Sequence, residues 1–133
     1  MASRPKYEVH VTRAARRDMI AVMKWSLKEF GEAAALRYDA LMTQALTDIG
    51  DDPERPGVQR RSGLAEGVLV YHLRFSRGRA KSAPGVVRNP RHFVIYRRRH
   101  DQTTVIDILR VLHDSRDLAR HLPEEYRRSA PQL

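Results

Sequence analysis

The segment TTVIDILRVL, residues 103–112, constrains the fold more than any other, because it predicts a strand that is buried on both faces. Its apolar, largely β-branched residues are Val105, Ile106, Ile108, Leu109, Val111 and Leu112. Apolar runs of this kind are typical of central strands, which have neighbours on both sides and cover on both faces. Such a strand requires a sheet around it, and we expect the rest of the chain to supply one.

Other segments predict further strands, each bounded by turn residues. The first, YEVHVT, alternates between apolar and polar side chains, and the others are rich in β-branched and aromatic residues. The short link HDQ before the run at 103–112 predicts an antiparallel hairpin. Segments rich in glycine and proline predict loops. The predicted strands span 7–12, 68–75 and 91–99, and the predicted loops span 50–63 and 76–90.

Two helices are predicted between the first and second strands. Residues 13–30 carry apolar side chains at helical spacing, and Thr12 is a suitable N-cap for them. Gly31 stands where a C-cap glycine belongs, and a second amphipathic helix fits 32–49. Two helices joined by one glycine predict a helical hairpin.

The fold class that follows is α+β, in the order β-α-α-β-β-β, with an antiparallel sheet packed by the helical hairpin. A short C-terminal helix is expected at 115–122, and the tail 123–133 is polar. The length of 133 residues fits a single domain over 1–133, with its core at about 7–122 and a basic insertion at 76–90.

Composition narrows the cellular setting. The chain has no cysteine, so it has neither a disulfide framework nor a thiolate metal site. It has no apolar run as long as a membrane span, and its first residues, MASRPKYEVH, lack the apolar region of a signal peptide. These features favour a cytoplasmic protein.

The positive charge is concentrated in one segment. Residues 74–100 hold nine Lys/Arg and no Asp/Glu, which accounts for the whole formal net charge of +9. A patch of this kind suits an acidic partner, and the alternative is a solvated surface that only aids solubility. The candidate binding residues are Arg77, Arg79, Lys81 and Arg88 in the insertion and Arg97, Arg98 and Arg99 at the end of a strand.

The junction His113-Asp114-Ser115 ends the central strand. A structural role fits His113, which would donate to a carbonyl or to a carboxylate such as Asp117, while Asp114 or Ser115 caps the terminal helix. The chain has six histidines, and they show no metal-ligand spacing, so we expect no metal.

Three motifs make the chain resemble the ParE branch of the RelE/ParE toxin superfamily. The helical hairpin has Asp18-Met19, the aromatic-glycine turn Phe30-Gly31 and Tyr38; HFVIYR resembles the central strand of the family; and ILRVLHDSRDLARHL resembles its C-terminal ending. The family usually has a tight turn where this chain has the insertion 76–90, which we expect to be a mobile loop that can be trimmed at 77–88.

The resemblance implies a type II toxin that poisons DNA gyrase, performs no catalysis and needs no cofactor. It also implies a ParD-like antitoxin, acidic and bound in a hetero-oligomer, for which Trp25, Phe30 and Tyr38 on the hairpin are candidate contacts. These aromatic residues could instead belong to the core.

Two other functions stay open. A RelE-type, ribosome-dependent endoribonuclease would need acid, base and cationic groups, for which His92, Tyr96, His113 and Arg116 are the candidates. Asp114 and Asp117 argue against it, because carboxylates repel a phosphate. The second alternative is a basic nucleic-acid-binding module without toxicity.

Overall fold

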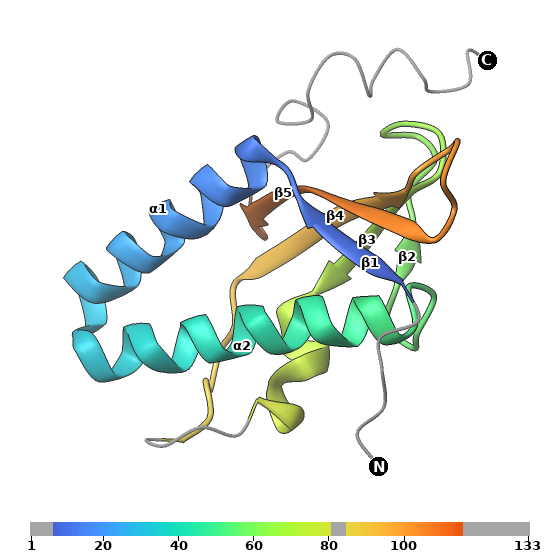
Figure 1. Cartoon of the computed structure of the whole chain (residues 1–133). Helices are drawn as coiled ribbons and strands as arrows, with labels where there is room; N and C mark the ends of the chain where they lie inside the picture. Colours follow the sequence, from blue (N-terminus) through green and yellow to red (C-terminus); the bar gives the residue numbers. More distant parts are fainter. Residues whose placement is uncertain (1–6, 81–84, 116–133) are drawn as a thin grey trace.

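A helical hairpin packs on one face of a five-stranded sheet in the computed structural model, which describes residues 7–80 and 85–115 (Figure 1). The strand order is β1-β5-β4-β3-β2. The helices are α1 (Arg13–Phe30), α2 (Glu32–Asp51) and the 3-10 helix η1 (Leu73–Arg79). The strands are β1 (Glu8–Val11), β2 (Gln59–Arg60), β3 (Val68–His72), β4 (His92–Arg98) and β5 (Val105–His113).

The helical hairpin confirms the sequence prediction, down to its caps. The Thr12 hydroxyl accepts a hydrogen bond from the Ala15 amide at 3.2 Å and donates one to the Ile108 carbonyl at 2.8 Å, so the same side chain starts α1 and ties it to β5. Gly31 separates the helices at φ 89°, a left-handed conformation that glycine adopts without strain.

The sheet is mixed, which corrects the antiparallel sheet expected from the sequence. Strands β3, β4 and β5 form the predicted antiparallel meander, whereas β1 pairs with β5 in parallel. The reason is the connection: a whole helical hairpin follows β1, so no tight turn forces this strand to run against its neighbour. Strand β5 is an interior strand, as its apolar sequence predicted.

Beyond Ile108, β5 has no strand on its outer side, and α1 takes that place. Asp18 accepts a hydrogen bond from the Val111 amide at 2.9 Å and forms a bidentate ion pair with Arg110, at 2.6 and 2.9 Å. The carboxylate therefore satisfies an amide at the open edge of the strand and fixes α1 against it.

Two apolar clusters lie on the two faces of the sheet. The larger cluster joins helix residues such as Leu41, Met42 and Ile49 to strand residues such as Tyr71 and Ile106. The smaller cluster consists of strand residues on the other face, with Leu64 and Ala65.

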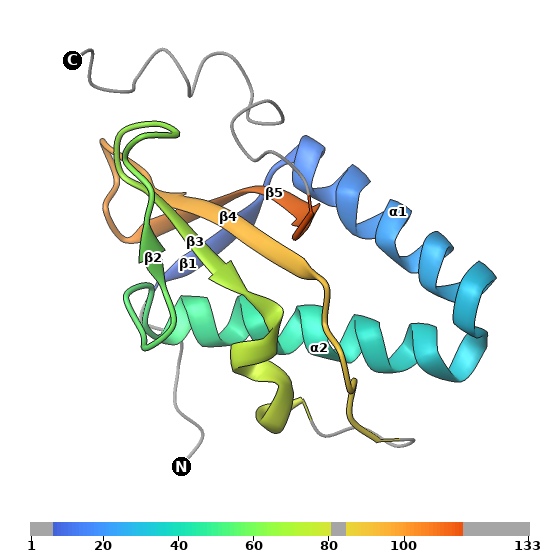
Figure 2. The same cartoon turned by 180° about the vertical axis from the view of Figure 1, so that it is seen from behind.

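The segment after β3 corrects two predictions. The predicted strand 68–75 ends at His72, and η1 then occupies the start of the segment expected to be a loop (Figure 2). The buried Asp48 carboxylate on α2 holds η1: it accepts a hydrogen bond from Ser76 at 2.6 Å and pairs with Arg79 at 3.2 Å. Trimming 77–88 would remove Arg79 and the packed end of η1, so we expect the shortened protein to be less stable, contrary to the expectation from the sequence.

Smaller differences concern the other predicted loop and the C-terminus. Residues 59 and 60, expected in a loop, form β2 and pair with β3. The predicted terminal helix at 115–122 and the tail 123–133 lie outside the described residues, apart from Ser115. None of the described helices is both long and apolar enough to span a membrane.

Candidate functional site

Three histidines meet at one end of the sheet, because the meander brings together the end of β3, the start of β4 and the end of β5. His92 pairs with His113 across β4 and β5, and their ring centroids are 5.3 Å apart. His72 pairs with Phe93, the next residue along β4. We call His72, His92, His113 and the neighbouring Asp114 the histidine cluster.

Asp114 is the anionic centre of the histidine cluster. Its carboxylate accepts from His72 Nε2 at 3.1 Å and pairs with Arg91 at 3.2 Å. The Arg74 amide donates to His72 Nδ1, so the ring proton of His72 sits on Nε2 and points at Asp114. Burial lowers the pKa of His72 and by itself would raise that of Asp114, but the hydrogen bond from His72 and the charge of Arg91 leave the Asp114 pKa below its usual range.

Tyr38 fixes the second histidine. Its hydroxyl lies 2.6 Å from His92 Nδ1 and accepts a hydrogen bond from the Arg91 amide at 2.9 Å. Burial lowers the pKa of His92 to about 4 and raises that of Tyr38 to about 12. Both groups are therefore neutral at pH 7, with Tyr38 donating to Nδ1 and the His92 ring proton on Nε2.

Aromatic rings extend the histidine cluster onto the helical hairpin. Trp25 makes edge-to-face contacts with His92 at 5.8 Å, Tyr38 at 6.5 Å and Phe30 at 5.4 Å between ring centroids. Tyr38 is buried, whereas Trp25 is 37% exposed and Phe30 is 64% exposed. Of the predicted antitoxin contacts, Tyr38 is thus a core residue, and Trp25 and Phe30 are accessible.

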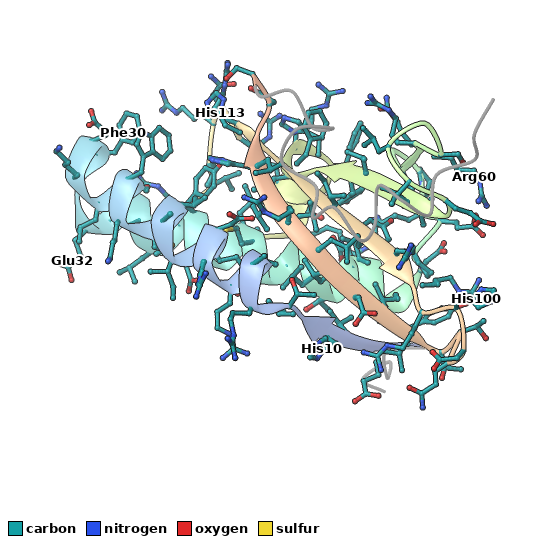
Figure 3. All side chains as sticks on the ribbon, turned by 90° about the horizontal axis from the view of Figure 1, so that it is seen from above. His10, Phe30, Glu32, Arg60, His100 and His113 are labelled. Carbon is teal, nitrogen blue, oxygen red and sulfur yellow. The ribbon has the colours of Figure 1, made fainter. Side chains whose placement is uncertain are left out.

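A cleft of about 1330 Å³ opens beside these rings, between the hairpin and the segment before β4. Trp25, Phe30 and Arg37 line it from the helices, and Arg77, Arg88 and Arg91 line it from the other side, with His113 at the end of β5. None of its lining residues in the described chain is acidic. We call this hollow the basic cleft; Figure 3 shows Phe30 and His113 on the same side of the molecule.

A second hollow, of about 510 Å³, lies on the opposite flank of α1 and is mainly apolar. Residues two apart on a helix point to nearly opposite sides, so Met23 and Leu27 face away from Trp25. Leu27 and Ile20 line this hollow and are each about half exposed (53% and 51%). Three methionines, Met19, Met23 and Met42, also line this hollow, which we call the apolar groove. Arg16, Lys24 and Asp39 are its charged lining residues.

The predicted basic residues divide into two groups at opposite ends of β4. Arg77 and Arg88 line the basic cleft, and Arg77 donates to the Arg88 carbonyl at 2.8 Å. Arg79 pairs with Asp48, and Lys81 lies outside the described residues.

Arg97, Arg98 and Arg99 lie at the far end of β4, directly before His100 in the sequence, and Figure 3 labels His100. Arg98 stacks over Tyr7 at 5.1 Å, and Arg99 forms a bidentate ion pair with Asp107.

The nuclease candidates are also separated. His92 and His113 meet, but Tyr96 is buried on the central part of β4 and donates to the Pro53 carbonyl at 2.5 Å, and burial raises its pKa. Arg116 and Asp117 lie outside the described residues, where the proposed contact between His113 and Asp117 also falls. His113 Nδ1 instead accepts from the Ser115 amide at 3.1 Å. Within 7–80 and 85–115, no group of three or more His, Asp or Glu side chains is arranged to hold a metal ion.

Sequence reasoning missed His72, Arg91 and Arg37, and it did not predict the contacts of Asp114 with His72 and Arg91. The signal was present for the histidines, since an antiparallel meander must bring the end of one strand beside the start of the next. No sequence pattern pointed to Arg37, because only the packing of α2 places it across from the segment before β4.

The order of strand, helical hairpin and antiparallel meander, with β1 beside β5, defines the class of RelE/ParE-like toxins. Within this class, the model of the family described as the ParE toxin of the type II toxin–antitoxin system, parDE, matches residues 9–118, and the chain belongs to that family. It is therefore a toxin with a cognate antitoxin. No curated protein matched the chain.

Proposed function

We propose that this ParE-family toxin inhibits DNA gyrase, blocks replication by stabilising cleaved DNA, and performs no catalysis itself. The observation that carries the proposal is membership of the ParE family, together with the close likeness of the C-terminal ending to ParE chains. Inhibition of this kind needs a binding surface, and the basic cleft and the apolar groove are two such surfaces.

The hydrogen bonds of the histidine cluster and the protonation state of His92 support a binding role rather than a catalytic one. The Nδ1 atoms of His72, His92 and His113 each have a hydrogen-bond partner within the protein. His92 is buried and neutral, and the Asp114 carboxylate lies close to His72 and His113, where it would repel a phosphate. Catalysis would require a general base whose pKa lies near neutral pH, and burial holds the pKa of His92 well below neutral.

The experiment that tests the proposal is induced expression in growing cells, with DNA-damage signalling and protein synthesis followed together. Gyrase poisoning predicts an early damage response while protein synthesis continues. Loss of protein synthesis before any damage response would contradict the proposal.

We also propose that the antitoxin covers both flanks of α1. The apolar groove suits the apolar face of an amphipathic helix, which is a common mode of peptide recognition. The arginines of the basic cleft suit a following acidic segment, which would lie over Trp25 and Phe30. One chain that bound both surfaces would hide the accessible aromatic residues and neutralise the positive charge.

One observation favours a second function, ribosome-dependent cleavage of RNA. His92 and His113 both line a smaller hollow of about 450 Å³ on the Trp25 side of α1, which also contains Arg110 and its ion-pair partner Asp18. Two histidines and a cation are groups that RNA cleavage can use. Codon-linked cleavage of messenger RNA by the purified toxin on ribosomes, lost in His113→Gln, would establish this function in place of gyrase inhibition.

A further inference from the structure

We propose that the basic cleft binds single-stranded nucleic acid directly, with its arginines on the phosphates and the rings of Trp25 and Phe30 against the bases. This goes beyond gyrase inhibition and antitoxin binding, because it gives the toxin a nucleic-acid site of its own. The site does not depend on which enzyme the toxin acts on.

The charge of the cleft is available to a ligand. Two basic residues of the segment that carries the excess charge, Arg79 and Arg99, form ion pairs with Asp48 and Asp107. Their charges are therefore compensated within the protein. Arg91, which lines the cleft, forms an ion pair with Asp114, and His72 contacts the same carboxylate. No carboxylate in the described part of the chain pairs with Arg37, Arg77 or Arg88. Arg77 is anchored by a neutral carbonyl, which orients its guanidinium without cancelling its charge.

The two walls of the cleft place these charges on both sides of a ligand. Arg37 stands on α2, and Arg77 and Arg88 stand on the segments after β3 and before β4. A nucleic-acid backbone has a charge at every nucleotide, so it can contact arginines on both walls at once. Arginine forks also match the geometry of phosphate oxygens.

The aromatic residues distinguish this cleft from a surface that is only basic. Trp25 is held by edge-to-face contacts on Tyr38 and His92, so its ring is fixed before a ligand arrives. Phe30 stands beside it and is more exposed than buried. Rings of this kind form stacking platforms for bases, and stacking together with a positive groove is the usual basis of single-strand binding.

A single strand fits this arrangement better than a duplex or an acidic peptide. A duplex hides the faces of its bases, so they could not reach rings that lie inside a hollow. An acidic peptide could use the arginines, but carboxylate side chains offer no flat surface to Trp25 and Phe30. Both ligands can use the arginines of the cleft, but an unpaired strand can also stack its bases on the two rings.

The test uses the full toxin and a thymidine oligonucleotide of about 15 nucleotides, near the upper end of known site sizes. Trp25 is the only tryptophan of the chain, so its fluorescence reports on the cleft directly. Binding should quench this fluorescence. The Arg37→Gln/Arg88→Gln variant should bind roughly tenfold more weakly at physiological salt, and the slope of log affinity against log salt should fall by about 1.4. Phe30→Ala should weaken binding by about tenfold.

The matched control is Arg13→Gln/Arg17→Gln, which removes the same charge from exposed positions outside the cleft. It should bind the oligonucleotide like the unchanged toxin, and thermal melting should show all variants folded. Polyglutamate of equal charge should bind without the quenching.

Equal losses in the control and cleft variants would overturn the proposal, because they would show diffuse electrostatic attraction. Equal affinity and quenching with polyglutamate would also overturn it and make the cleft a peptide site. Unchanged Trp25 fluorescence at saturating oligonucleotide would exclude the stacking contact and contradict the proposal.

Discussion

His92 is a buried titratable residue, and its chemistry follows from that burial. The residue is 5% exposed, its Nδ1 accepts a hydrogen bond from the Tyr38 hydroxyl, and burial lowers its pKa to about 4. An unfolded chain would return the same ring to its ordinary pKa of about 6.5. Folding therefore opposes protonation of His92, and this couples stability to pH.

The coupling predicts a loss of stability in mild acid. Between about pH 6.5 and pH 4 the unfolded chain holds a proton on His92 that the folded protein lacks, so the free energy of unfolding falls as the pH falls through this window. Across this window the stability lost through His92 is up to about 3 kcal/mol. His92→Asn keeps an acceptor near Nδ1 but cannot titrate, so its stability should fall less over this range. Denaturant unfolding at several pH values measures the difference.

His72 acts in the same direction, because burial lowers its pKa as well, so some acid sensitivity should persist in His92→Asn. The pKa of Asp114 is lowered in the folded protein, so its carboxylate stabilises the folded state at pH values above its ordinary pKa of about 3.8. This stabilisation is lost only when the pH falls below that value. His10→Asn on β1 is the control, since His10 is exposed and lies outside the histidine cluster. Parallel pH profiles for His92→Asn and the unchanged protein would show that His92 is not the group responsible.

Helix η1 depends on a single buried carboxylate on α2. Asp48 is fully buried and accepts hydrogen bonds from Gln44 at 2.9 Å and Ser76 at 2.6 Å, and Arg55 and Arg79 balance its charge. Ser76 in turn contacts the buried Tyr71 hydroxyl at 2.8 Å. This network fixes the chain as it leaves β3 and enters the segment that forms one wall of the basic cleft.

Asp48→Ala should destabilise the protein by about 3 kcal/mol, because it leaves Ser76, Gln44 and two arginines without their acceptor. Asp39→Ala, on the same helix but exposed, should cost less than about 0.5 kcal/mol. Equilibrium unfolding in urea compares the two variants. Similar stabilities would mean that the carboxylate does not hold η1.

Local signals in the sequence predicted the elements that depend on local chemistry. Thr12 and Gly31 set the limits of α1, and the apolar run at 103–112 identified an interior strand. Helix η1 was not predictable, because Ser76 is fixed by Asp48, 28 positions earlier. The parallel pairing of β1 was likewise a result of tertiary packing.

For the candidate site, too, the sequence indicated single residues, whereas tertiary packing decided their contacts. The sequence identified the aromatic residues, His92 and His113, but it did not identify His72 or predict that these residues meet. His113 was expected to bond Asp117, but within the described residues it contacts Ser115, and Asp114 turns to His72 and Arg91. The register of three strands decides these contacts, and register depends on the whole sheet.

Across the whole molecule, the charged ends of the sheet have different roles. At the β4–β5 hairpin, Asp107 compensates the charge of Arg99, whereas Arg98 donates to the neutral Thr103 carbonyl and stacks over Tyr7. At the histidine end, Arg37 and Arg88 face the basic cleft. The apolar groove lies on the other flank of α1, so a partner must wrap this helix to cover both surfaces.

Antitoxin binding should therefore depend on the groove as well as on charge. Ile20→Ala/Leu27→Ala should weaken binding of the cognate antitoxin at least tenfold, about 1.4 kcal/mol, with little effect on stability because both side chains are half exposed. Leu36→Ala is the control, since Leu36 is 56% exposed on α2 but does not line the groove. Calorimetric titration compares the variants; a loss that is no greater than in the control would place the antitoxin elsewhere.

The central claim is that this toxin acts on gyrase by binding, and supercoiling of relaxed plasmid by purified gyrase tests it most directly. With increasing toxin, we predict loss of supercoiling, accumulation of cleaved DNA that requires gyrase, and recovery when the cognate antitoxin is added. Normal supercoiling without cleaved DNA, at an excess of toxin that still binds its antitoxin, would contradict the claim.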